Sequence, residues 1–295
     1  MGVKLSMQKK RWIPFLLLLP ALAIMFFLMI FPVFWNINIS LHNVKTTNIN
    51  DVWPFVGFNN WVKIFQDEYF LQSLKVTLFF VLGSVFFQIL IGFFIARILI
   101  ERVWGTKFFR VLFIMPWLLS ATIVGFSWQW MYNDYFGLIN GMLMRIGAQP
   151  VNWISDPNMA LISLLIANIW FGTPFSILFQ ESSLLTIDRT LYEAAKIDGA
   201  SPIQSFFNIT LPLLSPFLGI NLILTSMWSV NLFDLQLVLT GGGPLMSTTT
   251  ASLYMYKQGF EQGNLSIGAT IGLVLLIINI AVSFVYLRLM RGEQP

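Results

Sequence analysis

Long apolar runs alternate with short polar stretches along this chain of 295 residues. A helix needs roughly 20 predominantly apolar residues to cross the hydrocarbon core of a bilayer. Runs of about that length extend over residues 12–35, 74–100, 111–131, 159–179, 213–235 and 267–289. We therefore predict an all-α polytopic membrane protein with six transmembrane helices.

The first apolar run follows Lys9, Lys10 and Arg11, as the apolar core of a signal peptide would. Residues 21–23, Ala-Leu-Ala, even resemble a cleavage site. The run continues well past them, however, and exceeds the roughly 7 to 15 apolar residues of a signal peptide. We expect a retained first span, followed over residues 36–72 by a polar loop whose aromatic residues suit a membrane interface.

Composition supports this interpretation. Hydrophobic residues make up 57% of the chain and charged residues only 10%, whereas soluble domains carry about 25% charged residues. One soluble core cannot bury so many apolar side chains, so the solvent must be lipid. The chain contains no cysteine, which excludes disulfides and thiolate metal sites.

The basic residues are distributed unevenly between the polar stretches. With the N-terminus inside, the inner side carries Lys4, Lys9, Lys10, Arg11, Arg97, Arg102, Lys107, Arg110, Arg189, Lys196, Arg288 and Arg291, and the outer side carries Lys45, Lys63, Lys75, Arg145 and Lys257. Cytoplasmic loops carry an excess of Lys and Arg. We therefore predict both termini in the cytoplasm, and we explain the net charge of +4 by topology rather than by nucleic-acid binding.

No constellation of catalytic residues is visible. The sequence lacks the P-loop, Gly-x-Ser-x-Gly and His-Glu-x-x-His motifs. The single histidine, His42, has no second histidine with which to share a metal ion. The Gly-rich stretch 240–250 carries no Gly-Lys-Ser/Thr, and we interpret it as a turn. We expect no catalytic residue, no metal site and no cofactor bound by this chain, so any ATP must be bound by another chain.

The most polar segment between two apolar runs predicts two short helices that meet at Gly199. Thr190 can cap the first helix, with Glu193 completing a capping box. Ser201 and Gln204 form the same pattern at the start of the second helix. The first helix would have about nine residues, roughly 14 Å, and is too short to be stable alone in water. It needs a partner surface.

Polar, small and aromatic residues recur at helical spacing on three predicted spans. They are Asn221, Thr225, Trp228 and Ser229 on the fifth span, Asn168, Phe171, Gly172 and Phe175 on the fourth, and Trp117 and Ala121 on the third. One interpretation is helix packing, because hydrogen bonds between membrane helices contribute about 0.6 to 2 kcal/mol each. The other is a path for a neutral, hydroxyl-rich solute. The spacing leaves both open.

A specific motif coincides with the polar segment. Its residues are Tyr192, Glu193, Ala194, Ala195, Asp198, Gly199, Ile209, Leu211 and Pro212. The pattern resembles the EAA loop in permease subunits of ABC importers, and the extended form with Tyr192 and Asp198 looks like that of the carbohydrate branch. The Gly-Gly-Pro stretch at 242–244, followed by three threonines at 248–250, is similar to permeases of the maltose and glycerol-phosphate type.

The resemblance covers roughly the whole chain and implies the type I (MetI-like) permease fold in a bacterial or archaeal cytoplasmic membrane. It implies a second permease subunit, two copies of an ABC ATP-binding subunit that hold ATP and Mg²⁺, and an external solute-binding protein. The EAA segment, residues 186–212, would be a coupling helix on an ATPase subunit, with Glu193 paired to a basic group there. Residues 1–71 would form the N-terminus, first span and outer loop, 72–289 the permease core, and 290–295 a cytoplasmic tail.

The resemblance also implies a solute path. Of the ten polar, small and aromatic residues named above on the three spans, all except Phe171 and Asn221 would line it. Maltose-type permeases have a polar hydroxyl where this chain has Ala121, so their sugar specificity does not transfer. We expect import of a sugar or oligosaccharide, or of another small polar solute such as a glycerol phosphate. The alternatives are an ATP-independent secondary sugar transporter, which the absence of a visible internal repeat disfavours, and a membrane enzyme acting on lipid-linked sugars.

Overall fold

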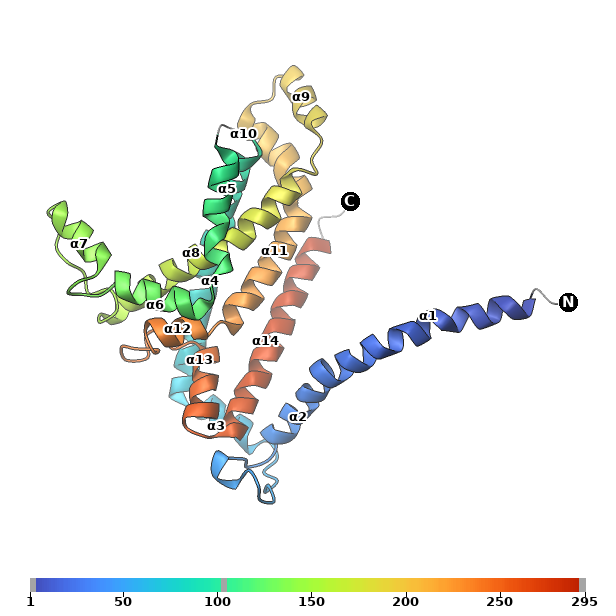
Figure 1. Ribbon diagram of the computed structural model, residues 1–295, viewed down its shortest axis with the longest axis vertical. Helices are drawn as coiled ribbons and strands as arrows, with labels where there is room; N and C mark the ends of the chain where they lie inside the picture. The colour runs from blue at the N-terminus through green and yellow to red at the C-terminus, as the bar shows by residue number, and fades with distance from the viewer. Residues whose placement is uncertain (1–3, 102–104, 292–295) are drawn as a thin grey trace. The chain divides into compact units, whose positions relative to one another are not determined.

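The computed structural model describes residues 4–101 and 105–291, with the side chains of 15–101 and 105–288 (Figure 1). Most of the predicted tail at 290–295, and the side chains of Lys4, Lys9, Lys10, Arg11, Arg102 and Arg291, lie outside the described residues. The chain divides into two compact units, Met1–Ile64 with Lys257–Val274, and Phe65–Tyr256 with Leu275–Pro295.

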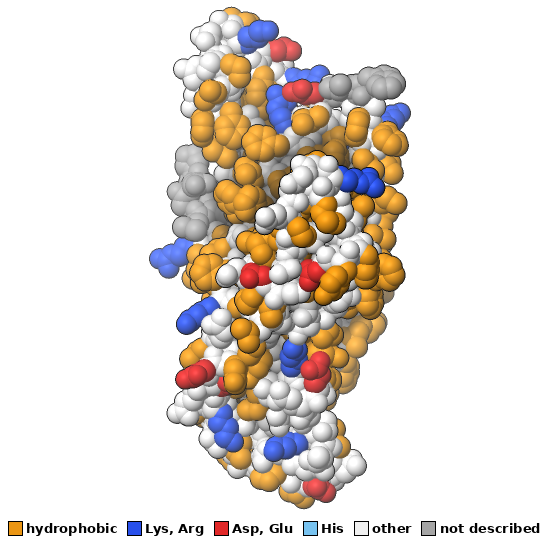
Figure 2. Space-filling model, turned by 90° about the vertical axis from the view of Figure 1, so that its left-hand side faces the viewer, with side chains coloured by type: hydrophobic (Ala, Val, Ile, Leu, Met, Phe, Trp, Pro, Cys, Tyr) orange, Lys and Arg blue, Asp and Glu red, His pale blue; other side chains and the backbone are white. Residues whose placement is uncertain are grey.

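The described helices contain five single spans and a bent pair that makes a sixth if its two halves count as one span. Five are long and apolar enough to cross a membrane: Phe15–Ser40, Glu68–Ile100, Pro157–Leu184, Pro202–Asn231 and Leu265–Arg288. A sixth apolar stretch is a bent pair, Thr106–Leu118 and Ala121–Met131, with 102° between its halves. The predicted all-α class is confirmed. Figure 2 shows hydrophobic side chains over much of the face that it draws, as a surface in contact with lipid requires.

The first unit holds the N-terminal span and a folded loop. Its helices are α1 (Lys4–Met25), a π-helical turn (Phe26–Ile30), α2 (Phe31–Ser40), most of α3 (Asn59–Gln66) and the first part of α14 (Leu265–Arg291). In the loop after α2, the Asn60 amide donates to the carbonyls of Ser40 and His42, at 2.8 and 2.9 Å. The His42 ring packs against Phe55, which agrees with a structural role for this histidine.

The second unit is built on long helices that pack side by side. In chain order its helices are α4 (Glu68–Ile100), α5 (Thr106–Ile114), α6 (Ala121–Met131), α7 (Leu138–Arg145), α8 (Pro157–Leu184), α9 (Arg189–Ile197), α10 (Pro202–Ser205), α11 (Leu211–Asn231), α12 (Asp234–Leu239) and α13 (Ala251–Tyr256). α4 packs along α8 and α11, and α12 packs on α6. The core joins Phe80 of α4, Val124 of α6, Leu164 and Phe171 of α8, and Leu235 of α12.

Side-chain caps explain where the long helices begin. The Asp67 carboxylate accepts the Tyr69 N–H at 2.9 Å and starts α4. Asp156 accepts two backbone N–H groups, each at 2.9 Å, and starts α8, whose first residue is Pro157. Both spans therefore have a defined polar end.

The third predicted span is not one straight helix. After α5, a 3₁₀ turn (Met115–Leu118) contains Pro116, and Leu119 is extended. Ser120 then caps α6, its hydroxyl accepting the Ile123 N–H at 3.3 Å. The continuous run predicted over residues 111–131 was wrong in this respect, because Pro116 removes a helical N–H and Ser120 offers a new helix start.

Candidate functional site

The EAA segment forms two short helices, α9 and α10, around Gly199, as predicted. Gly199 has φ +77°, a conformation that favours glycine. At the start of α10 the Ser201 hydroxyl accepts the Gln204 N–H at 3.3 Å, and the Gln204 side chain accepts the Ser201 N–H at 2.7 Å. The predicted second capping box is therefore confirmed.

The first cap is a different residue from the predicted one. α9 begins at Arg189, and its N-cap is Asp188, whose carboxylate accepts the Thr190 N–H at 3.0 Å. This hydrogen bond favours the charged form and lowers the pKa of Asp188. The prediction that Thr190 and Glu193 form a capping box was wrong, because the carboxylate two residues earlier takes the cap position.

Apolar side chains of the EAA segment are exposed. α9 has no buried residue, and Leu191 and Ile197 are 43% and 85% exposed. Glu193 is exposed and makes no ion pair or hydrogen bond with any described side chain. The Tyr192 hydroxyl is 2.8 Å from the Thr210 hydroxyl and ties α9 to the start of the fifth span. In Figure 1, α9 lies beyond the ends of α8 and α11.

The rest of the motif lies where the segment returns to the fifth span. Ile209 belongs to a π-helical turn (Phe206–Thr210) between α10 and α11, and Leu211 and Pro212 begin α11. Ile209 and Leu211 are partly buried, whereas Pro212 is exposed. The motif therefore extends from α9 to the start of α11.

Part of the fourth-span stripe faces α4. The Asn168 amide donates to the Ser84 hydroxyl at 2.7 Å, and the Asn168 carbonyl accepts the Gln88 amide at 2.9 Å. A Cβ added to Gly172 would lie 2.5 Å from Gln88, so glycine allows this close approach. Asn168 and Gly172 hold two helices together here, and their predicted place on a solute path stays a prediction.

The polar residues of the fifth span lie between helices. The Asn221 side-chain oxygen accepts from Thr225 at 3.0 Å and from Ser176 of α8 at 3.4 Å. Asn221, Thr225 and Ser229 are at most 2% exposed. The helix-packing interpretation thus has a direct contact between helices for Asn221, whereas the Thr225 hydrogen bond stays within α11, and the buried Asn221 Nδ2 and Ser229 Oγ have no hydrogen-bond partner in the described structure.

The aromatic residues divide into two groups. Trp117 is 44% exposed and stacks near Phe175, with 6.0 Å between ring centres. These two rings line a cavity of about 440 Å³. The rest of its lining consists of three hydroxyl-bearing residues, Ser182, Ser183 and Thr186, and three apolar ones, Leu178, Phe179 and Phe217. Phe171 is buried against Trp228, at 5.1 Å, and Ala121 is buried in the core. Only Trp117 and Phe175 of the predicted path line this open cavity.

One ion pair was missed by the sequence reasoning. The Arg110 guanidinium of α5 pairs with the Glu181 carboxylate of α8. Glu181 is buried and lies in the last turn of α8, where the helix dipole disfavours a negative charge. A single carboxylate near the end of an apolar run was the available signal, because such a group usually has a partner.

The Gly-Gly-Pro loop is held by the threonines that follow it. The Thr249 hydroxyl donates to the Gly242 carbonyl at 2.8 Å, and the Thr248 hydroxyl donates to the Gly243 carbonyl at 2.9 Å. The Thr77 hydroxyl of α4 accepts the Ala251 N–H at 2.8 Å. The interpretation of this stretch as a turn agrees with these bonds. Among the described residues, no group of three or more His, Asp or Glu side chains is placed to hold a metal ion.

A family of known transport proteins matches the chain over residues 88–292. Its description is "Binding-protein-dependent transport system inner membrane component". The chain belongs to this family. It is therefore a membrane component of a transport system, as the EAA motif predicted.

Three curated relatives align over nearly all of the chain. The trehalose/maltose transport system permease protein of Thermococcus litoralis is 37% identical over 95% of this chain and 94% of its own length. The sulfoquinovosyl glycerol transport system permease protein of Agrobacterium fabrum is 31% identical over 96% and 92%. The sn-glycerol-3-phosphate permease protein of Yersinia pestis is 29% identical over 96% and 95%.

Solved structures show the same fold. A chain of a bacterial ABC transporter involved in alginate import matches with a TM-score of 0.81 and 22% identity, covering 99% of this chain and 100% of that one. The MetNI methionine ABC transporter matches with a TM-score of 0.55 and 18% identity, over 76% of this chain and 96% of that one. The predicted type I permease fold is confirmed.

Proposed function

We propose that this permease is one of two permease subunits in an ATP-driven importer of a sugar or oligosaccharide. Two relatives are named for trehalose and maltose and for sulfoquinovosyl glycerol. The cavity beside Trp117 supports an uncharged solute, because it is lined by aromatic rings and by no charged side chain. Its three hydroxyls, of Ser182, Ser183 and Thr186, already donate to backbone carbonyls. A phosphate dianion in that cavity would lack a cation to pair with, which favours a sugar over a glycerol phosphate.

The observation that carries the coupling role is the exposed apolar surface of α9. A nine-residue helix is too short to be stable alone, and burying Leu191 and Ile197 would remove apolar surface from water. An ATP-binding subunit on the cytoplasmic side would cover this surface. Glu193 would then be free to pair with a basic group of that subunit, since α9 is capped by Asp188 instead.

A movement of α9 has a physical route to the solute cavity. The Tyr192–Thr210 hydrogen bond joins α9 to the helical stretch Pro202–Asn231. Trp228 on that stretch contacts Phe171 of α8, one turn from Phe175 in the cavity wall. ATP bound to the partner subunits would supply the energy that moves α9, and this chain would pass the motion on through α11. An external binding protein would deliver the solute.

The proposed orientation places both termini and the EAA segment in the cytoplasm. Its support is the excess of Lys and Arg on that side. The second permease, two ATP-binding subunits that hold ATP and Mg²⁺, and the external binding protein belong to the same proposal.

Co-expression with the neighbouring transport genes and reconstitution into vesicles tests the proposal. We expect the permease to retain an ATP-binding subunit on purification, and we expect sugar uptake that vanadate abolishes and an uncoupler does not affect. Uptake that collapses with an uncoupler and ignores vanadate would instead identify a secondary transporter.

A further inference from the structure

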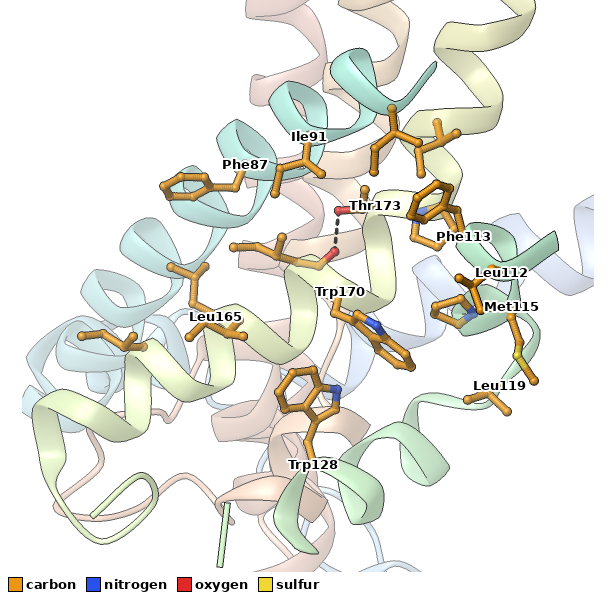
Figure 3. A pocket seen from close by; sticks show the side chains of 17 residues that line it. Phe87, Ile91, Leu112, Phe113, Met115, Leu119, Trp128, Leu165, Trp170 and Thr173 are labelled. Carbon is orange, nitrogen blue, oxygen red and sulfur yellow. Dashed lines mark hydrogen bonds between the residues drawn. The ribbon is translucent and has the colours of Figure 1, made fainter. Parts of the chain in front are cut away.

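An apolar groove runs between α4, α8 and the turn from α5 into α6. Its volume is about 870 Å³, and Figure 3 shows side chains from these helices around it, with Phe87 and Ile91 on one side and Phe113 on the other. Besides two tryptophan N–H groups, Thr173 carries the only polar side-chain group in its lining. The Thr173 hydroxyl already donates to a backbone carbonyl at 2.6 Å. The groove therefore offers almost nothing to a polar ligand.

A second cavity of about 630 Å³ lies beside this groove, toward the start of α5. On α5, Arg110 of the second cavity lies one turn from Phe113 of the groove, and on α8, Glu181 lies one turn from Ile177. Lys107 also lines the second cavity. The two linings share no residue, and we take the adjacent cavities together as one slot with a long apolar part and one basic end.

The basic end has capacity for an anion. Glu181 pairs with one terminal nitrogen of Arg110, and the other terminal nitrogen makes no hydrogen bond with a described residue, whereas the Arg110 Nε is buried out of reach of a ligand. Lys107 makes no ion pair with a described carboxylate. The two cations and one carboxylate leave a formal charge of +1. α5 also begins here, and its N-cap Gly105 provides no side-chain acceptor, so the positive end of the helix dipole adds to the attraction.

The part of the slot that lies along α5 is about as long as one leaflet of a bilayer. α5 has nine residues and is about 14 Å long, about half of the roughly 30 Å hydrocarbon core. On α8 the lining continues farther, from Leu185 to Ile162, past Trp170, whose ring meets that of Trp128 edge to face at 5.9 Å. Under the orientation proposed above, the basic end faces the cytoplasmic surface, where anionic lipids gather and basic pockets between helices bind their headgroups.

We propose that the slot binds one anionic phospholipid of the cytoplasmic leaflet. One acyl chain lies in the apolar groove, and the phosphate contacts Lys107 and the terminal nitrogen of Arg110 that is not paired with Glu181. The bound lipid would fill the space between α5 and α8, and so support the Arg110–Glu181 pair at its edge.

Lipid titration of the purified transporter, followed by native mass spectrometry, tests the headgroup site. We expect phosphatidylglycerol to bind more tightly than phosphatidylcholine with the same acyl chains. Lys107→Gln should weaken phosphatidylglycerol binding about fivefold, which is about 1 kcal/mol for one basic side chain near a membrane surface, and leave phosphatidylcholine unchanged. Arg288→Gln is the matched control, because Arg288 is exposed and does not line either cavity. Equal binding of both lipids, or equal effects of both variants, would overturn the proposal.

A second pair of variants tests the acyl chain. Ile91 and Leu90 are neighbours on α4, 36% and 39% exposed, but only Ile91 lines the groove. Ile91→Trp should fill the groove and weaken both lipids, whereas Leu90→Trp should weaken neither. Binding of phosphatidylglycerol unchanged in Ile91→Trp would place the lipid elsewhere and overturn the assignment.

The competing occupant is a helix of the second permease. Because the chain contains no cysteine, Ile166→Cys carries a single benzophenone label in the wall of the groove. In the assembled transporter we expect the label to form a lipid adduct. A covalent adduct with the second permease would identify the groove as a subunit interface and refute the lipid site, and displacement of the lipid by soluble glycerol phosphate would show that only an anion pocket exists.

Discussion

The EAA segment and the membrane spans each contain residues that differ in polarity from their surroundings, but in opposite directions. In α9, apolar side chains such as Leu191 and Ile197 stand exposed in a polar segment. In α8 and α11, polar side chains such as Asn168 and Asn221 are buried in apolar helices and hydrogen-bonded to their neighbours. The exposed exceptions need a partner from outside the chain, whereas the buried ones have only part of their hydrogen bonds within it: Asn168 Oδ1, Asn221 Nδ2 and Ser229 Oγ are buried and have no hydrogen-bond partner in the described structure. Chemical contrast alone therefore does not identify a functional residue; the partners that each group has and those that it lacks must both be considered.

The largest effect should come from charging the surface of α9. Ala194 is exposed, so Ala194→Asp should change the stability of this chain by no more than about 0.5 kcal/mol. It should reduce ATP-driven uptake at least tenfold, because a docked carboxylate loses its water. Uptake in vesicles and retention of the ATP-binding subunit measure the effect.

The control makes the same change at Ala148, which is exposed in the loop after α7. Ala148→Asp should insert normally and transport at the wild-type rate. If both variants transport equally well, α9 is not a docking surface and the contrast with the buried stripes disappears.

A smaller effect should separate the two groups of predicted path residues. Trp117 is exposed to a cavity, and Trp117→Ala should change the relative uptake of different sugars with little change in thermal stability. Asn168 bonds to Ser84, and Asn168→Ala should lower stability by about 0.6 to 2 kcal/mol without changing solute preference. Competition uptake assays and thermal unfolding in detergent measure both properties. If Asn168→Ala changed the relative uptake of different sugars, Asn168 would contact the solute, and the packing interpretation of this residue would be wrong.

The smallest effect concerns the start of α9. The Thr190 N–H lowers the pKa of Asp188 below the ordinary value of about 3.9, so the charged carboxylate stabilises the helix start. This contribution is complete above about pH 5 and is lost as the pH falls through the lowered pKa. A nitroxide on Arg189→Cys should become more mobile at that pH. Asp188→Asn keeps an oxygen acceptor but cannot titrate, so its label mobility should not depend on pH in this range.

Much of the fold was predictable because a membrane-spanning helix requires a long apolar segment in the sequence. A span must be apolar for about 20 residues, so the six runs stood out. The break in the third span was harder to predict, although Pro116 and Ser120 were both visible. A proline inside an apolar run either kinks a helix or ends it, and neighbouring helices decide which. Here α8 packs on both halves, and α12 packs on the second half, α6.

The site was predictable only where local chemistry determines it. The Ser201–Gln204 capping box involves residues three apart and was predicted correctly. The Asp188 cap was missed because Thr190 offered an equally valid local solution. The partners of Asn168 and Glu181 lie 84 and 71 residues away along the chain. No spacing rule reaches that far, so the packing contacts of these residues required the structure, and the solute path stays a prediction.

The broken third span also has a consequence for the way the chain is made. At about 14 Å, α5 is too short to cross the membrane by itself. Its Arg110 pairs with Glu181, which leaves the ribosome 71 residues later. The contact that fixes α5 against α8 can therefore form only after α8 has been synthesised.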